Sequence, residues 1–213
     1  MKKDIHSMLR KRIIRGEYEQ GEIIREADVA KEFQVSRTPV REVFQHLQNE
    51  KLIILLPYRG AQVTFIELEF FFQTVAVKRT LEEMATRLAA RWATESDIRQ
   101  MREITDRLRE YNPEKDLESF EMFLELDTQF HRTVWQASRN GLLVDLLEQM
   151  QIHIERYYYY SRHTAAGTMG GFYDDFSAII QAITQHDPDA ASAAVLTHLD
   201  GYYEVIHRTY TKE

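Results

Sequence analysis

Two groups of residues in this 213-residue chain have types and spacings that could do chemistry. Asp127 and His131 are four positions apart, so on a helix both side chains would project from one face, about one turn apart. A carboxylate and an imidazole at that spacing can bind one divalent cation, but they also commonly form a simple ion pair or hydrogen bond. The spacing alone therefore leaves a metal site and a structural pair as alternatives.

A second group lies near the N-terminus, in the stretch Val35-Ser-Arg-Thr-Pro-Val-Arg-Glu42. Its first residues can cap a helix, with the proline tolerated in the first turn. Arg37 and Arg41 would then lie on the first turn and a half, and a guanidinium fork fits the O6 and N7 atoms of guanine. The hydroxyls of Ser36 and Thr38 suit phosphate oxygens. A capped helix with solvated arginines is the alternative for any one of these residues, but the ordered set favours contact with DNA.

The elements around this second group form a small N-terminal domain. Hydrophobic spacing and helix breakers predict helices from Ile5 to Gly16, over 27–33 and over 36–50, followed by strands over 52–56 and 61–65. In the turn between the strands, Gly60 lets the backbone approach a minor groove closely, and Arg59 can lie along that groove. Three helices and a hairpin in residues 1–66 are the outline of a winged helix-turn-helix.

The rest of the chain predicts only helices, over 67–92, 95–111, 115–137, 141–161, 172–186 and 188–210. Thr94-Glu-Ser-Asp97 fits a capping box, and Asp187 can cap the last helix. Residues 165–171 are the expected flexible loop. We therefore expect a mainly α protein with two domains, a winged helix-turn-helix over 1–66 and an all-α helical bundle over 67–213.

Charge separates these two domains. Residues 1–66 carry 12 Lys and Arg against 9 Asp and Glu, whereas the remaining residues carry 15 against 25. A mildly basic head on an acidic body indicates that only the head meets a polyanion.

Composition narrows the class of protein. A content of 44% hydrophobic and 29% charged residues is typical of a globular chain and excludes a disordered one. The absence of cysteine excludes thiolate nucleophiles and thiolate metal sites. No apolar run approaches the ~20 residues that span a bilayer, and no signal peptide is visible. We expect a cytoplasmic protein without a membrane partner.

The stretch from Val35 to Glu42 resembles the start of the recognition helix in GntR-family transcriptional regulators. Gly16 and Gly21 match a glycine-containing turn of that family, and residues 57–60 lie where its wing tip falls. The resemblance covers residues 5–66 without a gap. It implies that the third helix enters the major groove of a double-stranded DNA operator. Several members carry a further basic residue where this chain has Ala27, so no base contact is expected there.

The helical body resembles the FCD-type ligand-binding domain of the FadR subgroup over nearly all of residues 67–200. Residues 78–90 resemble its first helix, Asp127-Thr-Gln-Phe-His131 matches its D-x-x-F-H motif, and 179–183 and 194–199 match its last two helices. This resemblance implies control by a small-molecule effector, with an organic acid as the candidate class. The effector contacts that it implies are Lys78, Asp127, His131, Phe176 and His198.

The same resemblance implies a divalent metal such as zinc or nickel, held in the subgroup by one aspartate and three histidines. Asp127, His131 and His198 stand at three of those positions. Phe176 occupies the fourth and cannot ligate, and Asp175 beside it is rotated by about 100° from that direction. The subgroup commonly has arginine where this chain has Lys78, which lacks the bidentate fork. A three-ligand metal site and a metal-free polar pocket both remain open at this point.

Two functions follow from these features. The first is a transcriptional regulator, with a repressor favoured, that binds a pseudo-palindromic operator as a homodimer because one recognition helix reads too few bases. The alternative is a metal-dependent enzyme that uses the Asp/His/His cluster, since a metal with open positions can activate water. The sequence offers no general base or nucleophile beside that cluster, so we assign no catalytic residue. A base-reading helix also has no role in such an enzyme, and the regulator is the favoured interpretation.

Overall fold

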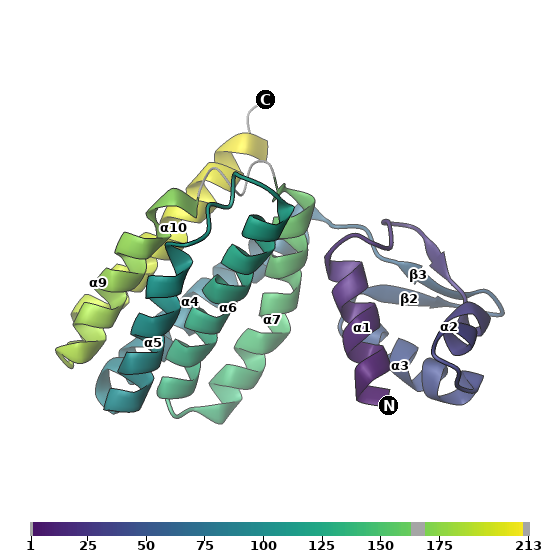
Figure 1. The fold of residues 1–213 in the computed structure, drawn as a ribbon, viewed down its shortest axis with the longest axis horizontal. Coiled ribbons are helices and arrows are strands. Elements are labelled where there is room, and N and C mark those ends of the chain that lie inside the picture. The colour runs from purple at the N-terminus through teal and green to yellow at the C-terminus, as the bar shows by residue number, and fades with distance from the viewer. Residues whose placement is uncertain (1, 163–168, 211–213) are drawn as a thin grey trace. The chain divides into compact units, whose positions relative to one another are not determined.

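The computed structural model describes residues 2–162 and 169–210, which divide into two compact units (Figure 1). The first unit runs up to Phe72 and also includes Gln151–Tyr160. The second unit comprises the other described residues.

The first unit has the three helices and the hairpin that the sequence predicts. Its elements are α1 (Lys2–Ile14), β1 (Ile23–Ile24), α2 (Glu26–Glu32), α3 (Arg37–Asn49), β2 (Ile53–Leu56) and β3 (Gly60–Val63). The strands form an antiparallel sheet in the order β1-β3-β2, and the β2–β3 register pairs Ile53 with Val63 and Leu56 with Gly60. The third strand, β1, is absent from the sequence predictions. Two residues are too few to show an alternating pattern, so only the pairing with β3 reveals this strand.

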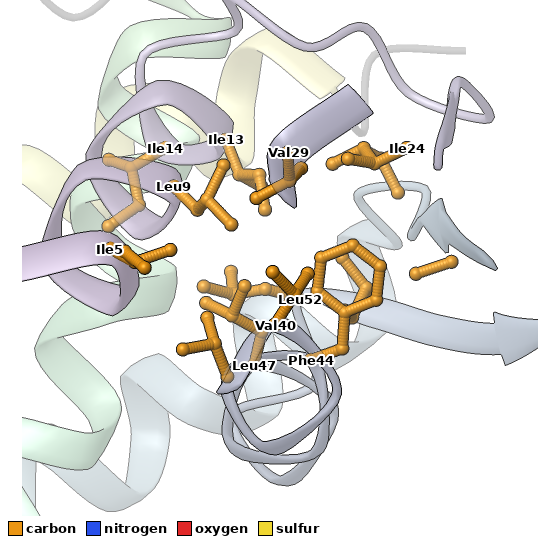
Figure 2. Close-up of a cluster of buried hydrophobic side chains, with 14 of the residues drawn as sticks. Ile5, Leu9, Ile13, Ile14, Ile24, Val29, Val40, Phe44, Leu47 and Leu52 are labelled. Carbon is orange, nitrogen blue, oxygen red and sulfur yellow. The ribbon is translucent and has the colours of Figure 1, made fainter. Parts of the chain in front are cut away.

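The core of the first unit explains why these helices form. Ile5, Leu9 and Ile13 recur every four residues on one face of α1 and are almost completely buried. They face apolar side chains of α3 and of the segment after it, including Val40, Phe44, Leu47 and Leu52, as Figure 2 shows. Burial of one face of α3 leaves its opposite face, which carries Arg37 and Arg41, exposed.

The second unit is built from helices, and the mainly α fold class is confirmed. The helices are α4 (Leu68–Trp92), α5 (Glu95–Leu108), α6 (Leu117–Ala137), α7 (Gly141–Tyr160), α9 (Phe172–Thr184) and α10 (Pro188–Tyr210), with a short 3-10 helix η1 (Met169–Gly171). The first residues of α4 and the last ten of α7 belong to the first unit. Helix α9 packs against both α5 and α10, and α5 packs against α6. None of the described helices is long and apolar enough to cross a membrane.

Two predicted helix caps are confirmed. The Thr94 hydroxyl accepts the Asp97 N–H, and the Asp97 carboxylate accepts the Thr94 N–H, which is a reciprocal capping box at the start of α5. The Asp187 carboxylate accepts the N–H groups of residues 189 and 190 at the start of α10. Helices α5 and α9 end two or three residues earlier than the sequence indicates. Of the flexible loop expected over 165–171, residues 165–168 lie outside the described part of the chain. The other three residues, 169–171, form η1.

Candidate functional site

The first candidate site is an exposed face of the first unit. A groove of about 1120 Å³ is lined by Arg37 and Arg41 of α3, by Arg59 and Gly60 at the hairpin tip, and by Arg25 before α2. The structure therefore brings four arginines from three segments to one open groove. The lining also contains the acids Glu26 and Asp28, so the arginines leave an excess of positive charge, which attracts a polyanion such as the DNA backbone.

The start of α3 is free to meet a ligand. Ser36, Arg37 and Thr38 are all exposed. Ser36 is the N-cap residue and has an extended backbone, but its side chain makes no capping hydrogen bond. Its hydroxyl therefore does not cap the helix, and the N–H groups of the first turn still need hydrogen-bond acceptors. Both features suit a phosphate oxygen.

Arg41 is held by a partner that the sequence did not indicate. Its Nε lies 3.0 and 2.8 Å from the two carboxylate oxygens of Glu26 on α2. The Arg41 side chain remains 65% exposed. A guanidinium has five N–H donors, so its terminal nitrogens still have donors for a base edge. The Glu26 contact directs Arg41 and does not occupy the whole side chain.

The structure requires glycine at position 60. Its φ is +106°, and a Cβ at this position would come within 2.3 Å of the Ile24 carbonyl oxygen on β1. Any larger residue would therefore push β1 away from β3. The sequence indicated that glycine allows close approach to DNA, whereas the structure shows close approach to a neighbouring strand.

Two further residues face the same groove and were missed from the sequence. Gln45 is exposed one turn beyond Arg41, so that Arg37, Arg41 and Gln45 recur every four residues. That spacing was a visible signal. Tyr58 is fully exposed at the hairpin tip with φ of +63°, a conformation that the sequence pattern does not reveal.

The second candidate site is a buried cluster in the second unit. His131 Nε2 lies 3.6 Å from Asp127 Oδ1 on the same face of α6, as their spacing predicts. His198 on α10 brings its Nε2 to 3.3 Å from His131 Nε2. All three residues are buried, and each offers one ligand atom within 4.8 Å of the other two. The structure thus gathers the three predicted metal ligands at one point.

Two carboxylates lie on the outer sides of the histidines. His131 Nδ1 is 2.9 Å from Glu82 Oε2, and His198 Nδ1 is 3.2 Å from Asp175 Oδ2. Neither acid was singled out as a site residue from the sequence. Asp175 does point away from the Nε2 atoms, as its rotation indicated, but its carboxylate still meets the far nitrogen of His198. The i, i+4 spacing of Lys78 and Glu82 was the available signal for Glu82.

Lys78, an expected effector contact, forms an ion pair with Glu82. Both side chains are buried, and the Lys78 ammonium lies 5.4 Å from the centroid of the Trp135 ring. Burial alone would raise the pKa of Glu82, but His131 and Lys78 hold it well below its usual range. Burial alone would lower the pKa of His131, but the Glu82 and Asp127 carboxylates reverse this and raise it to about 9.

Phe176 forms an apolar wall of the cluster. Its ring stacks on Phe130 with centroids 3.8 Å apart and meets the His131 and His198 rings at 5.7 and 5.0 Å. Phe172 covers His198 from another direction at 4.5 Å. Phe176 therefore occupies space beside the two imidazoles and supplies no ligand atom.

The cluster fits a divalent metal ion. Asp127 Oδ1 is buried and has no hydrogen-bond partner among the described residues. Two ligands about 2.1 Å from a tetrahedral zinc ion lie about 3.4 Å apart, and the observed separations are 3.3 and 3.6 Å. Neutral imidazole nitrogens and a carboxylate oxygen are the donors that zinc and nickel accept.

Comparison with known families covers both units. Residues 1–63 match the family described as bacterial regulatory proteins, gntR family. Residues 73–201 match the FCD domain family. The two matches run in the order that the sequence indicated, a DNA-binding head followed by a helical body.

Individual proteins agree with these matches. The chain is 29% identical to the HTH-type transcriptional repressor RspR of Escherichia coli strain K12. The 205 aligned residues cover 96% of this chain and 88% of the relative. It is 28% identical to the galactonate operon transcriptional repressor of the same strain, over 89% of each chain. The solved structure of E. coli McbR/YncC has the same fold, with a TM-score of 0.83 at 16% identity over 99% of this chain and 98% of that one.

Proposed function

The chain belongs to the gntR family of bacterial regulatory proteins and carries an FCD domain, and from this premise we propose how it works. It is a transcriptional regulator that binds double-stranded DNA, and the alternative of a metal-dependent enzyme finds no support among its relatives. In our proposal it represses transcription, in keeping with the names of the relatives, and a small effector bound in the second unit controls it. Binding to chromosomal DNA would place it in the bacterial cytoplasm.

The single observation that carries the DNA-binding assignment is the arginine-lined groove of the first unit. In our proposal α3 enters the major groove, where Arg37 and Arg41 contact base edges. Ser36 and Thr38 then bind phosphates beside them. Arg59 and Gly60 follow the adjacent minor groove, which attracts arginine by its negative potential.

Gln45 extends the base-reading face of α3. Its exposed amide lies one turn beyond Arg41 on the groove side. A glutamine amide offers one donor and one acceptor, the pair that adenine N7 and N6 require. The operator is therefore expected to contain adenine near the guanines read by the arginines.

An apolar surface of the second unit supports a homodimer. Val77, Met84 and Trp92 on α4 are 50%, 49% and 59% exposed, although each is a large hydrophobic side chain. Leu142 and Leu146 on α7 are exposed as well. Helices α4 and α7 share a buried cluster that includes Ala85, Leu143 and Leu147, so these two helices are neighbours. A second copy of the chain that covers this surface would remove the apolar side chains from water.

Sedimentation tests the dimer directly. The wild-type chain should sediment at about twice 25.2 kDa at micromolar concentration. Met84→Glu should shift it toward the monomer because a charge would be buried at the interface. Leu117→Glu is the matched control, since Leu117 is 47% exposed on α6. A monomeric wild type, or equal behaviour of the two variants, would contradict this interface.

The buried cluster of the second unit is the proposed effector site. Asp127, His131 and His198 would hold one divalent ion such as zinc or nickel. The ion would supply open coordination positions for the carboxylate of an organic acid. Lys78 and Phe176 would line the same site, one as a charge beside Glu82 and the other as an apolar wall. A relative named as the galactonate operon repressor supports an organic acid as the effector class.

Selection from a pool of random DNA duplexes tests the function. The wild-type protein should enrich a pseudo-palindromic sequence, and Arg37→Ala should not. A reporter gene placed behind the selected sequence should be transcribed less when the protein is present. No enriched sequence would contradict the DNA interface, and higher transcription would contradict repression. Thermal shift with a set of organic acids then identifies an effector, because ligands that bind the folded state raise its melting temperature.

A further inference from the structure

We propose that Asp175 and Glu82 are positioning residues for the metal: each fixes the Nδ1 side of one histidine, so that both Nε2 atoms converge with Asp127 Oδ1. This inference rests on the proposed metal site and goes beyond its three ligands. It concerns how this chain compensates for a ligand set that Phe176 leaves one residue short.

Asp175 contacts the outer nitrogen of His198. Asp175 Oδ2 lies 3.2 Å from His198 Nδ1, on the side of the ring opposite the Nε2 that faces His131. A carboxylate is only an acceptor, so the Nδ1 must carry the proton. This leaves the Nε2 of a neutral imidazole with its lone pair directed into the cluster, which is the form that binds a metal.

Glu82 on α4 makes the equivalent contact with His131. Glu82 Oε2 accepts from His131 Nδ1 at 2.9 Å, and its other oxygen meets the Lys78 ammonium. The lysine balances part of the Glu82 charge and holds the carboxylate in place. His131 therefore has the same arrangement as His198, with an acid on Nδ1 and Nε2 facing the centre.

Phe176 supplies no ligand atom, so the protein offers three ligands. Four protein ligands constrain one another, whereas three leave the ring orientations to the surroundings. Phe176 and Phe172 restrict the His198 ring by packing at 5.0 and 4.5 Å, but packing does not select a tautomer. Asp175 provides that selection from the position next to the missing ligand.

Metal titration of the full-length protein, stripped with a chelator and desalted, tests the proposal. Cobalt(II) is the probe, because its visible absorption reports the ligand geometry, and zinc is measured by competition with a coloured chelator. Asp175→Ala should weaken zinc binding by about 10–100-fold and alter the cobalt spectrum. Asp175→Asn keeps an acceptor oxygen for Nδ1–H and should restore part of the affinity. Glu82→Ala should weaken zinc binding as well.

Asp174→Ala is the matched control. It removes the same charge one residue away, and Asp174 is exposed. Its zinc affinity should stay within about twofold of wild type. The Asp175 side chain is 31% exposed, so its replacement should leave the melting temperature of the metal-free protein unchanged.

The outcomes separate this inference from the metal site itself. Wild-type protein that binds neither cobalt nor zinc overturns the metal site and the positioning role together. Wild-type protein that binds zinc, with Asp175→Ala binding equally well and giving the same cobalt spectrum, overturns only the positioning role. A loss of affinity in Asp175→Ala that Asp174→Ala does not share supports it.

Discussion

The Nε2 atoms of His131 and His198 lie 3.3 Å apart, although the two residues are 67 positions apart in the chain and stand on different helices. Two neutral imidazoles that face each other through bare nitrogens would repel, so a proton or a cation must lie between them. With Asp127 Oδ1 beside them and acids on their outer nitrogens, these atoms suit either a proton carried by His131, whose pKa is raised to about 9, or the proposed divalent ion in its place.

Phe176→His should add a fourth protein ligand to the proposed metal site and tighten metal binding. The Phe176 ring already lies beside both histidines, so an imidazole at that position needs little movement to reach the same ion. We expect zinc affinity to rise by roughly tenfold or more. The metal-free variant should lose about 1–3 kcal/mol of stability, because the stacking on Phe130 is lost.

Phe176→Leu separates the two effects, since it removes the same ring and adds no ligand. Its metal-free stability should fall in a similar way while its zinc affinity stays near the wild-type value. Competition with a coloured chelator and thermal unfolding measure the two quantities. If Phe176→His binds zinc no better than Phe176→Leu, the residue does not face the metal.

The sequence predicted the inner part of this cluster better than the outer part. Asp127 and His131 share a helix face by their spacing alone, and the family resemblance pointed to His198. The contacts of Glu82 and Asp175 depend on how α4 and α9 pack around α6 and α10, and no local pattern encodes that packing. Rotation along one helix shows which way Asp175 points, but the partner that it meets belongs to another helix.

Arg37→Ala should weaken binding to the selected operator by about 1–3 kcal/mol and reduce discrimination between related sequences. The reason is the loss of a bidentate contact from the groove face of α3. A gel-shift titration measures both quantities. Arg99→Ala is the control, since Arg99 is an exposed arginine on α5 of the other unit. Equal affinities for the two variants would remove Arg37 from the interface.

Gln45→Ala should relax specificity at one base pair and leave the salt dependence of binding unchanged. A base contact carries sequence information, whereas a phosphate contact releases counterions and changes the salt slope. Selection from random duplexes with this variant should lose the preference for adenine at a single position in each half-site. An unchanged selected sequence would show that Gln45 does not read a base.

Gly60→Ala should destabilise the first unit and lower operator affinity at the same time. The substitution combines a positive φ with a Cβ placed 2.3 Å from the Ile24 carbonyl oxygen, so β1 must move. Gly16→Ala is the matched control, because Gly16 has φ of +74° but no atom within 4 Å of its Cβ position. We expect about 1–2 kcal/mol of lost stability for Gly16→Ala and a larger loss for Gly60→Ala, measured by urea unfolding. Equal losses would show that the contact with β1 does not matter.

Gly60 also shows why strand β1 was not predicted from the sequence. The hairpin was predictable from two apolar runs around a proline-glycine turn, whereas β1 consists of only Ile23 and Ile24. Its partner is 37 or more residues away, and the constraint appears only at Gly60, where the two backbones meet. Helices with a regular apolar spacing, such as α1 and α3, were predictable because each encodes its own buried face.

Acid should destabilise the first unit through His153, a residue near the end of α7. Burial is the main cause that lowers the pKa of His153 to about 4, and the nearby Arg156, Lys51 and Arg10 charges lower it further. The ring packs edge-on against Phe70 with centroids 5.0 Å apart. The ordinary pKa of histidine is near 6.5. Between pH 6.5 and 4, His153 is therefore protonated in the unfolded chain but neutral in the folded chain.

The sign of the effect follows from this difference. The stabilising contribution of neutral His153 is complete above pH 6.5 and decreases as the pH falls toward 4, by at most about 3 kcal/mol. His153→Gln cannot titrate, so its urea midpoint should fall less between pH 7 and 4.5 than that of the wild type. His46→Gln serves as the control, because His46 is exposed on α3, and it should follow the wild-type curve. A histidine that stays neutral in the folded state contributes to the pH dependence of stability, and removing it should remove that contribution. If His153→Gln nevertheless follows the wild-type curve, other groups cause the loss of stability in acid.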